Sequence, residues 1–520
     1  MKKFYSYLHF PLLIIIGITA VFYFNFTAED AYITYRYAEN WVNIGSLVYN
    51  AGEPINAMTS PLHAMLSAAL FFVTGNTVLS NKILFFVLLL LSALLVWYRY
   101  REHLHLQVLA ILLLFPPCVL MWTFGGLETP ILLFLATIAV ILANRQPPFS
   151  LNLLCVIFLL AGLAFLTRYD SILFFLPLTL YVASKARSIK HVLIAVVGAA
   201  ILPLAWLFIS INYYGDVFPT SFYVKTPTGN WGMLLLDGRY IAYYLLYIGI
   251  LPAIALVFVL LVPKHRTIDV LYRHFKSFWW LFLGLSLELF YGLTMATQHM
   301  MFSFRFFVPY IPSTVILVLD LLGRASETTE VNLSVGRPAY LFTGFLLCLT
   351  LFQLYQNVYT YNHSVNGISS IGEYRNLGIR DYVNFIQILQ EEGFDIERHW
   401  EVINGNGGRR PRIITFAAGM LPYTYRESYI YEKLVSFRHC HERYRQGLYA
   451  DYIHIMAPRQ GQVDQQLPNP IDSYYLVSSY EMMFDGSLQK FLVYYNPKPE
   501  AHNLTVGIND FCSQGVKAVN

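Results

Sequence analysis

The chain has 520 residues, of which 56% are hydrophobic and only 13% are charged. This composition leaves too little polar surface to cover a soluble protein, and it therefore indicates a polytopic membrane protein. The formal net charge of +4 is small and lies mostly in loops. Because no basic patch interleaved with aromatic residues is present, we expect no nucleic-acid partner.

The first apolar run covers 10–26 and follows Lys2 and Lys3. No small-x-small cleavage site comes after this run, which favours an uncleaved first span over a signal peptide.

The next stretch, 27–81, is predicted to be an outer loop, and it begins with the adjacent acids Glu29 and Asp30 soon after the first span. Charge at the end of a span is costly unless it faces a polar cavity, so these acids predict a functional site. The alternative is a solvated loop that happens to begin with acids.

Further apolar runs are separated by charged or Pro- and Gly-rich stretches and cover 61–74, 82–98, 106–122, 129–144, 151–166, 171–184, 190–213, 240–262, 277–297, 305–322 and 338–356. Most are long enough to cross a hydrocarbon core of about 30 Å. The run 61–74 would reach only about 21 Å as a helix. Because 171–184 is equally short, length does not decide which of these two runs spans.

The distribution of Lys and Arg favours a topology in which 61–74 does not cross the membrane. With the N-terminus inside, about eleven spans then put most of these cations into inner loops, as the positive-inside rule requires. The outer loops before the C-terminal part keep only Arg36, Lys82, Arg168, Lys225, Arg239 and Arg305. We expect 61–74 to lie in the outer interface.

This topology puts the chemically interesting segments on the outer side, where one outward-facing cavity can gather them. Besides Glu29 and Asp30, they are SPLHA with His63, FGGLETP with Glu128, TRYD with Arg168 and Asp170, FPTSFYVK with Lys225, and TQHMMFSFR with His299 and Arg305. Paired carboxylates and separate cations suit the transfer of a group from an anionic, membrane-embedded donor.

Asp30 is the candidate general base among these residues. Its neighbour Glu29 either raises the proton affinity of Asp30 by like-charge repulsion or shares a divalent cation with it, and the sequence does not choose between these two cases. Lys225, Arg305 and Arg168 are candidate ligands of a donor phosphate.

Several of these residues also have an ordinary structural explanation. Arg168 can pair with Asp170, and Arg305 can extend to the membrane interface. Glu128 can favour the start of a helix at Thr129. The two histidines, His63 and His299, can be packing residues.

After residue 356 the composition becomes more polar, which divides the chain into a membrane domain, 1–356, and a second domain, 357–520. The pattern predicts strands within 412–421, 474–481 and 491–496, and an amphipathic helix over 373–392. We therefore expect a mixed α/β domain on the extracytoplasmic side. Its Cys440 and Cys512 are compatible with a disulfide or with two free thiols.

Taken together, six segments resemble the bacterial GT-C integral membrane glycosyltransferases that use polyprenyl-phosphate sugars, and within them the arabinofuranosyltransferase-like branch. These segments are EDAYITYRYAENW, YNAGEPINAMTSPL, GGLETP, TRYD, FPTSFYVK and RFFVPYIP. The resemblance implies an inverting transfer with Asp30 as the general base, Lys225 as a donor-phosphate contact and Arg305 at the opening of a late helix. This chain has Glu29 where the family usually has Asp, and Ser221 where Asn is usual.

The leading hypothesis is an enzyme that moves a sugar from a polyprenyl-phosphate carrier to an acceptor hydroxyl on the outer face of the cytoplasmic (inner) membrane. A cell-envelope glycan, lipopolysaccharide or a protein would be the acceptor. The alternative is a transporter or flippase for lipid-linked saccharides, which needs alternating access. The sequence shows no inverted repeat, and its acids cluster on one side, which favours the enzyme.

Overall fold

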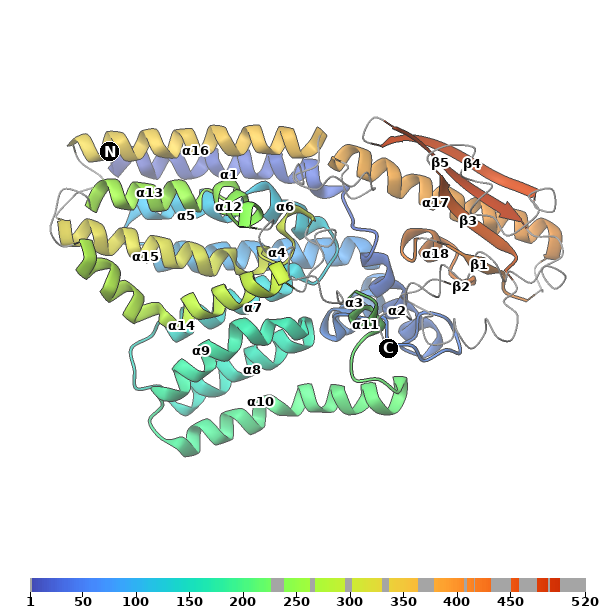
Figure 1. The fold of residues 1–520 in the computed structure, drawn as a ribbon, viewed down its shortest axis with the longest axis horizontal. Helices are drawn as coiled ribbons and strands as arrows, with labels where there is room; N and C mark the ends of the chain where they lie inside the picture. The colour runs from blue at the N-terminus through green and yellow to red at the C-terminus, as the bar shows by residue number, and fades with distance from the viewer. Residues whose placement is uncertain are drawn as a thin grey trace. The chain divides into compact units, whose positions relative to one another are not determined.

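The computed structural model describes residues 2–225, 238–261, 267–294, 302–329, 336–362, 378–405, 409–415, 417–431, 450–457, 475–484 and 487–495 (Figure 1). The chain divides into two compact units, each built from separate stretches. Unit 1 comprises Met1–Phe26, Lys82–Trp206 and Gly229–Ser369, and unit 2 comprises Thr27–Asn81, Leu207–Thr228 and Ser370–Asn520. The division at residue 357 stays a prediction.

Unit 1 is a bundle of apolar helices (Figure 1). The helices that lie wholly or mostly in this unit are α1 (Lys2–Phe24), α4 (Thr77–Arg99), α5 (Leu104–Leu114), α6 (Pro117–Phe124), α7 (Thr129–Ala143), α8 (Leu151–Thr167), α9 (Ile172–Ser184), α10 (Ile189–Ile209), α12 (Gly238–Tyr247), α13 (Ile250–Leu261), α14 (Thr267–Thr294), α15 (Ile311–Thr329) and α16 (Gly336–Asn362). Large apolar side chains such as Val21, Leu204 and Leu347 are exposed on these helices. Such faces are expected where helices meet lipid.

Among the described residues, four helices are long and apolar enough to cross a membrane, judged by length and composition: Thr77–Arg99, Ile189–Tyr214, Val308–Glu327 and Tyr340–Asn362. The bent pair α5 and α6 adds a fifth if it counts as one span. The presence of several such helices confirms the predicted multi-pass character of the chain. The number of about eleven spans, the orientation and the inner-membrane location stay predictions.

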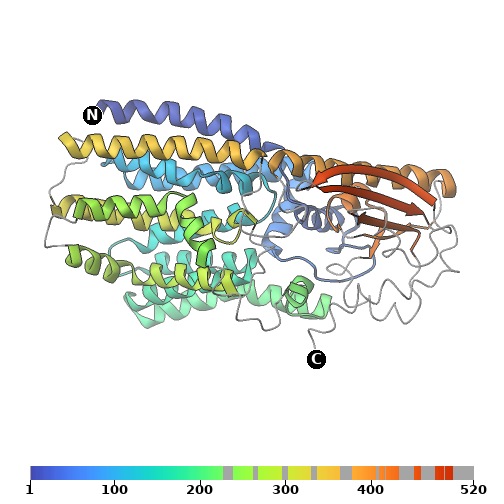
Figure 2. The same ribbon diagram turned by 45° about the horizontal axis from the view of Figure 1, so that its top comes forward.

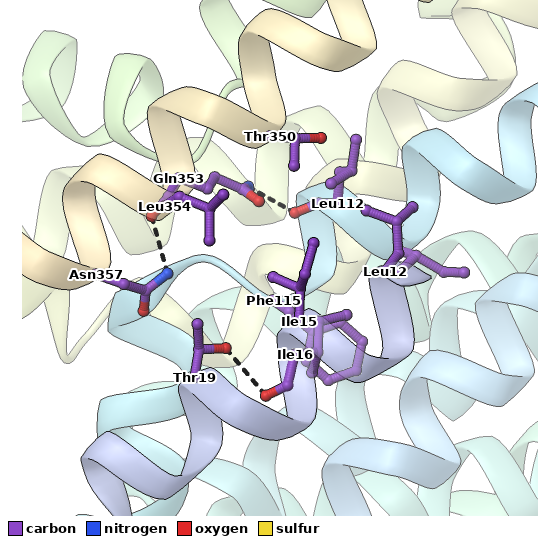
Figure 3. Close-up of a pocket in the computed structure, with 11 residues that line it drawn as sticks. Leu12, Ile15, Ile16, Thr19, Leu112, Phe115, Thr350, Gln353, Leu354 and Asn357 are labelled. Atoms are coloured by element: carbon purple, nitrogen blue, oxygen red, sulfur yellow. Dashed lines mark hydrogen bonds between the residues drawn. The ribbon is translucent and has the colours of Figure 1, made fainter. Parts of the chain in front are cut away.

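The predicted run 106–122 is broken into α5 and α6, which are bent by 56°. Pro116 has no N–H to donate to the carbonyl of Leu112, so a regular helix would leave that oxygen unpaired. Gln353 Nε2 of α16 donates to it at 2.6 Å (Figure 3). A pocket of about 20 Å³ lies beside this contact, which is room for a water-sized group and too small for a sugar.

Unit 2 begins with two short helices, α2 (Ala31–Ile44) and α3 (Pro61–Thr74). The bounds of α3 match the predicted run 61–74. The Ser60 hydroxyl accepts from His63 N–H, Pro61 occupies the first turn, and Gly75 ends the helix with φ 69. These are the residues that favour each position.

The C-terminal part of unit 2 combines helices α17 (Ile379–Asn404) and α18 (Met420–Thr424) with one sheet (Figures 1 and 2). The strand order is β2-β1-β3-β5-β4, with β1 parallel to β2 and β3, and β5 antiparallel to β3 and β4. The strands are β1 (Arg412–Ile414), β2 (Tyr429–Tyr431), β3 (Tyr452–Ala457), β4 (Tyr475–Phe484) and β5 (Ser487–Tyr495). The apolar face of α17 packs on β4 and β5. The predicted mixed α/β character is confirmed, and its extracytoplasmic location stays a prediction.

Candidate active-site residues

Four predicted site residues lie together in unit 1: Glu128, Arg168, Asp170 and Arg305. Arg168 donates from Nε and Nη2 to the two carboxylate oxygens of Asp170 at 3.0 and 2.7 Å, and from Nη1 to Glu128 Oε1 at 3.0 Å. Arg305 Nη2 donates to the same Glu128 oxygen at 3.4 Å. The Glu128 side chain is 1% exposed, and the other three are between 10 and 13% exposed. The formal charges balance, as a cluster removed from water requires.

Aromatic rings hold both guanidinium groups of this cluster. The Arg168 guanidinium lies 4.3 Å from the centroid of the Phe306 ring. The Arg305 guanidinium lies 5.5 Å from Trp122 and 5.9 Å from Phe306. Cation–π attraction at these distances adds to the shared contact with Glu128 in stabilising the two neighbouring cations.

The backbone before Arg305 adopts a conformation that side-chain-bearing residues rarely take. Ser303 has φ 45 and Phe304 has φ 58, both in the left-handed region. Trp122 Nε1 donates to the carbonyl oxygen of Ser303 at 3.1 Å. Strain of this kind persists where surrounding contacts enforce it, and it is commonest at functional sites. It is a structural signal that the sequence did not provide.

The Glu128 side chain is placed by a turn between α6 and α7. Gly126 has φ 77, which glycine adopts without strain. Glu128 is the residue before Thr129, where α7 begins with Pro130 in its first turn. The helix start predicted from Thr129 and Pro130 is therefore present, and the Glu128 carboxylate stands where a helix dipole favours negative charge.

Sequence reasoning missed Glu288, an acid inside the apolar run 277–297. Tyr310 Oη donates to Glu288 Oε1 at 2.8 Å, and Glu288 is 4% exposed. An ionisable residue inside an apolar run of a membrane protein is itself a signal of a functional site. That signal was available from the sequence.

Glu29 and Asp30 lie at the start of α2 in unit 2. The Glu29 N–H donates to Tyr382 Oη at 2.9 Å, and Glu29 Oε1 accepts from the N–H of Gly419. Asp30 is the half-buried N-cap residue of α2. Glu29 is thus engaged by the C-terminal part of unit 2, whereas Asp30 occupies a helix N-terminus, where negative charge is favoured.

The acid within α2, Glu39, was not among the predicted site residues. Its Oε1 accepts from Thr77 Oγ1 at 2.6 Å and from Tyr423 Oη at 2.5 Å, and its Oε2 lies 2.6 Å from Arg426 Nη1. Burial, and then the neighbouring Glu39 carboxylate, raise the pKa of Tyr423. The phenol therefore stays protonated and donates.

Arg36, also on α2, is 2% exposed. Within the described part of the chain, its guanidinium donates to four main-chain carbonyls. Nε donates to Tyr49 O at 3.0 Å and Nη1 to Pro422 O at 2.5 Å, and Nη2 donates to Arg426 O at 3.2 Å and Ser428 O at 2.6 Å. The rigid fork of arginine suits such a set of acceptors. Arg36 thereby connects α2 with the segment 422–428.

His63 is fully buried and lies against the Tyr35 ring, with 6.0 Å between centroids. Lys225 ends α11 (Thr220–Lys225), and its side chain is outside the described part of the chain. Thr220 anchors α11, since its N–H and Oγ1 donate to Asn56 O at 2.7 and 2.8 Å. His299 also lies outside the described residues.

Within the described ranges, no group of three or more His, Cys, Asp and Glu side chains is arranged to hold a metal ion. The divalent cation that Glu29 and Asp30 share in one of the two cases above stays a prediction. The single outward-facing cavity predicted from the sequence also stays a prediction.

No protein-family model matches the sequence, and no curated protein sequence matches it significantly. Among solved structures, the chain is similar to ArnT from Cupriavidus metallidurans in the apo state, with a TM-score of 0.59 and 12% identity over 94% of this chain and 98% of that one. The structure of ArnT from the same organism bound to undecaprenyl phosphate gives a TM-score of 0.57 and 11% identity, with the same coverage. The chain therefore has a GT-C fold, as the resemblance predicted, while the arabinofuranosyltransferase branch is not confirmed.

Proposed function

We propose that this protein is an inverting membrane glycosyltransferase that takes a sugar from a polyprenyl-phosphate carrier. The observation that supports this most is the structural similarity to ArnT, which extends over 94% of the chain. One of the similar ArnT structures is bound to undecaprenyl phosphate. The acids and cations singled out in the sequence suit this chemistry, because a lipid-linked donor is anionic and the acceptor must lose a proton.

Asp30 is the general base in this proposal. Its carboxylate takes the proton of the acceptor hydroxyl while that oxygen bonds to the anomeric carbon of the donor sugar. The bond between the anomeric carbon and the phosphate oxygen breaks with its electron pair, and the lipid phosphate leaves. Attack from the face opposite the leaving group inverts the anomeric centre.

Arg305 is a better candidate than Arg168 for the donor phosphate. The Arg168 fork is filled by the bidentate contact to Asp170 and a 3.0 Å bond to Glu128. The Arg305 contact to Glu128 is longer, at 3.4 Å, and therefore weaker. A phosphate that binds Arg305 replaces this long ionic hydrogen bond with a shorter one. Lys225 is proposed as a second phosphate ligand on the resemblance of FPTSFYVK alone.

The acceptor is proposed to be a cell-envelope glycan, lipopolysaccharide or a protein, and the reaction to occur on the outer face of the cytoplasmic membrane. The test is transfer by the purified full chain in detergent, with a panel of polyprenyl-phosphate sugars and a panel of these acceptors. The proposal expects one donor to yield a glycosylated product with inverted anomeric configuration. Facilitated movement of a lipid-linked saccharide across vesicles, without any product, would favour a transporter instead.

A further inference from the structure

Three side chains form a fully buried polar chain in unit 2: Glu392 of α17, His454 of β3 and Thr415, which directly follows β1. His454 Nε2 lies 2.9 Å from Glu392 Oε2, and His454 Nδ1 lies 2.8 Å from Thr415 Oγ1. The exposed fractions of Glu392 and His454 are 0%, and that of Thr415 is 1%. The register of β1 and β3, which pairs Ile414 with Ile453, places Thr415 beside His454.

The Thr415 hydroxyl closes the turn that follows β1. The N–H of Ala417 donates to Thr415 Oγ1 at 3.0 Å, and Oγ1 donates back to Ala417 O at 3.1 Å. His454 Nδ1 contacts the same hydroxyl oxygen, and Glu392 Oε2 lies 2.9 Å from the other ring nitrogen. Because the Thr415 hydroxyl gives its proton to Ala417 O, Nδ1–H of His454 is the donor to Thr415 Oγ1, and the buried ring supports the turn from behind.

The turn leads directly to the residues that hold Glu29. Ala418 O accepts from Tyr49 Oη, and the N–H of Gly419 donates to Glu29 Oε1. A Cβ at residue 419 would overlap the backbone carbonyl oxygen of Glu29, so the two segments are in close backbone contact. Glu29 immediately precedes Asp30, the N-cap residue of α2.

We propose that Glu392, His454 and Thr415 are positioning residues for the acidic pair, and that they act through the hydrogen bonds between Thr415 and Ala417 and through the segment 417–419. This proposal rests on the proposed function for its catalytic consequence, but its structural part is independent of it. None of the three is exposed enough to touch a substrate. Their contribution is to fix where the Asp30 carboxylate stands, and a displacement of about 1 Å at a reacting group can cost about 100-fold in rate.

The test compares three variants of the full chain in detergent. Thr415→Val keeps the shape of the side chain and removes the hydroxyl, and Thr415→Ser restores it. Tyr480→Phe is the matched control, because it removes a 2.8 Å hydrogen bond between β4 and α17, from Tyr480 Oη to Asp395 Oδ2, that does not lead to the turn. Amide hydrogen exchange over 417–424 and 27–36 is measured together with kcat and the donor KM.

Thr415→Val is expected to speed exchange in both segments by about tenfold or more and to lower kcat by about 10- to 100-fold with an unchanged donor KM. Thr415→Ser should restore both quantities, and Tyr480→Phe should change neither. Exchange in Thr415→Val that matches the wild type, or that matches Tyr480→Phe, would overturn the proposal. If the wild type transfers no sugar from any donor, the proposed function fails, while the exchange comparison still decides for or against the positioning network.

Discussion

The main-chain N–H of Gly419 donates a hydrogen bond to the carboxylate of Glu29, although 390 positions separate the two residues in the sequence. The contact joins the loop that follows the first apolar helix to the C-terminal part of unit 2. A candidate catalytic segment is thus held by residues from the other end of the chain.

Gly419→Ala should displace Glu29, because the new Cβ would meet the Glu29 backbone oxygen and its carboxylate. Overpacking of this kind is expected to lower the free energy of unfolding by about 1–3 kcal/mol. We also expect kcat for sugar transfer to fall at a temperature where the variant remains folded, so that unfolding does not explain the loss. An alanine variant with wild-type kcat would show that the close contact is dispensable.

Arg36→Lys should destabilise unit 2, since lysine lacks the planar fork that reaches the carbonyls of Tyr49, Pro422, Arg426 and Ser428. The loss of at least one bond from a charged donor, with carbonyls left unpaired, predicts a loss of about 3 kcal/mol. The measurement is denaturant or thermal unfolding of the purified protein. Arg380→Lys is the control, because the Arg380 side chain is 60% exposed; equal effects of the two changes would contradict the role assigned to Arg36.

Arg168→Gln should leave Asp170 and Glu128 as buried acids without their main cation. Breaking a buried pair from one side costs about 3–5 kcal/mol. The double variant Arg168→Gln with Asp170→Asn should be less destabilised than the sum of the two single changes, because the uncompensated charge disappears. Strictly additive effects in unfolding measurements would mean that the two side chains are not coupled.

Alkaline unfolding should report the buried phenol of Tyr32. Burial raises the pKa of Tyr32 to about 12, against about 10 in an unfolded chain. The stability from this group is therefore fully present below pH 10 and is lost as the pH rises through 12, with a slope of up to about 1.4 kcal/mol per pH unit. Tyr32→Phe should make the pH dependence shallower in this window, whereas Tyr340→Phe, at an exposed tyrosine, should not. An unchanged slope in Tyr32→Phe would argue against the burial of Tyr32.

Local signals in the sequence were sufficient for much of the fold. The run 61–74 became α3 with the same bounds because its cap residues, Ser60 and Gly75, are local. The helix predicted over 373–392 corresponds to α17, which begins at Ile379 and continues to Asn404, while 373–377 lie outside the described residues. Gly393, the residue after the predicted end, lies within α17, and a Cβ at this position would meet Thr424 of α18. Tertiary packing therefore overrides the local signal.

Part of the candidate site could also be predicted from local signals in the sequence. Glu29, Asp30, Glu128 and Arg168 stand out because charge is unusual beside apolar runs. The roles of other residues depend on partners that are distant in sequence, so no local pattern reveals them. Arg36 and Ser428 are 392 positions apart, and the left-handed backbone at Ser303 is held by Trp122, 181 positions away.

The proposed chemistry is tested most directly by sugar transfer from a polyprenyl-phosphate donor with purified wild type, Asp30→Asn and Glu29→Gln, together with donor binding by each. We expect Asp30→Asn to abolish transfer and retain donor binding, because it removes only the acceptor of the proton. Glu29→Gln, which keeps a side-chain oxygen for the Gly419 N–H, should retain part of the activity. Transfer at the wild-type rate by Asp30→Asn would contradict the assignment of Asp30 as the general base.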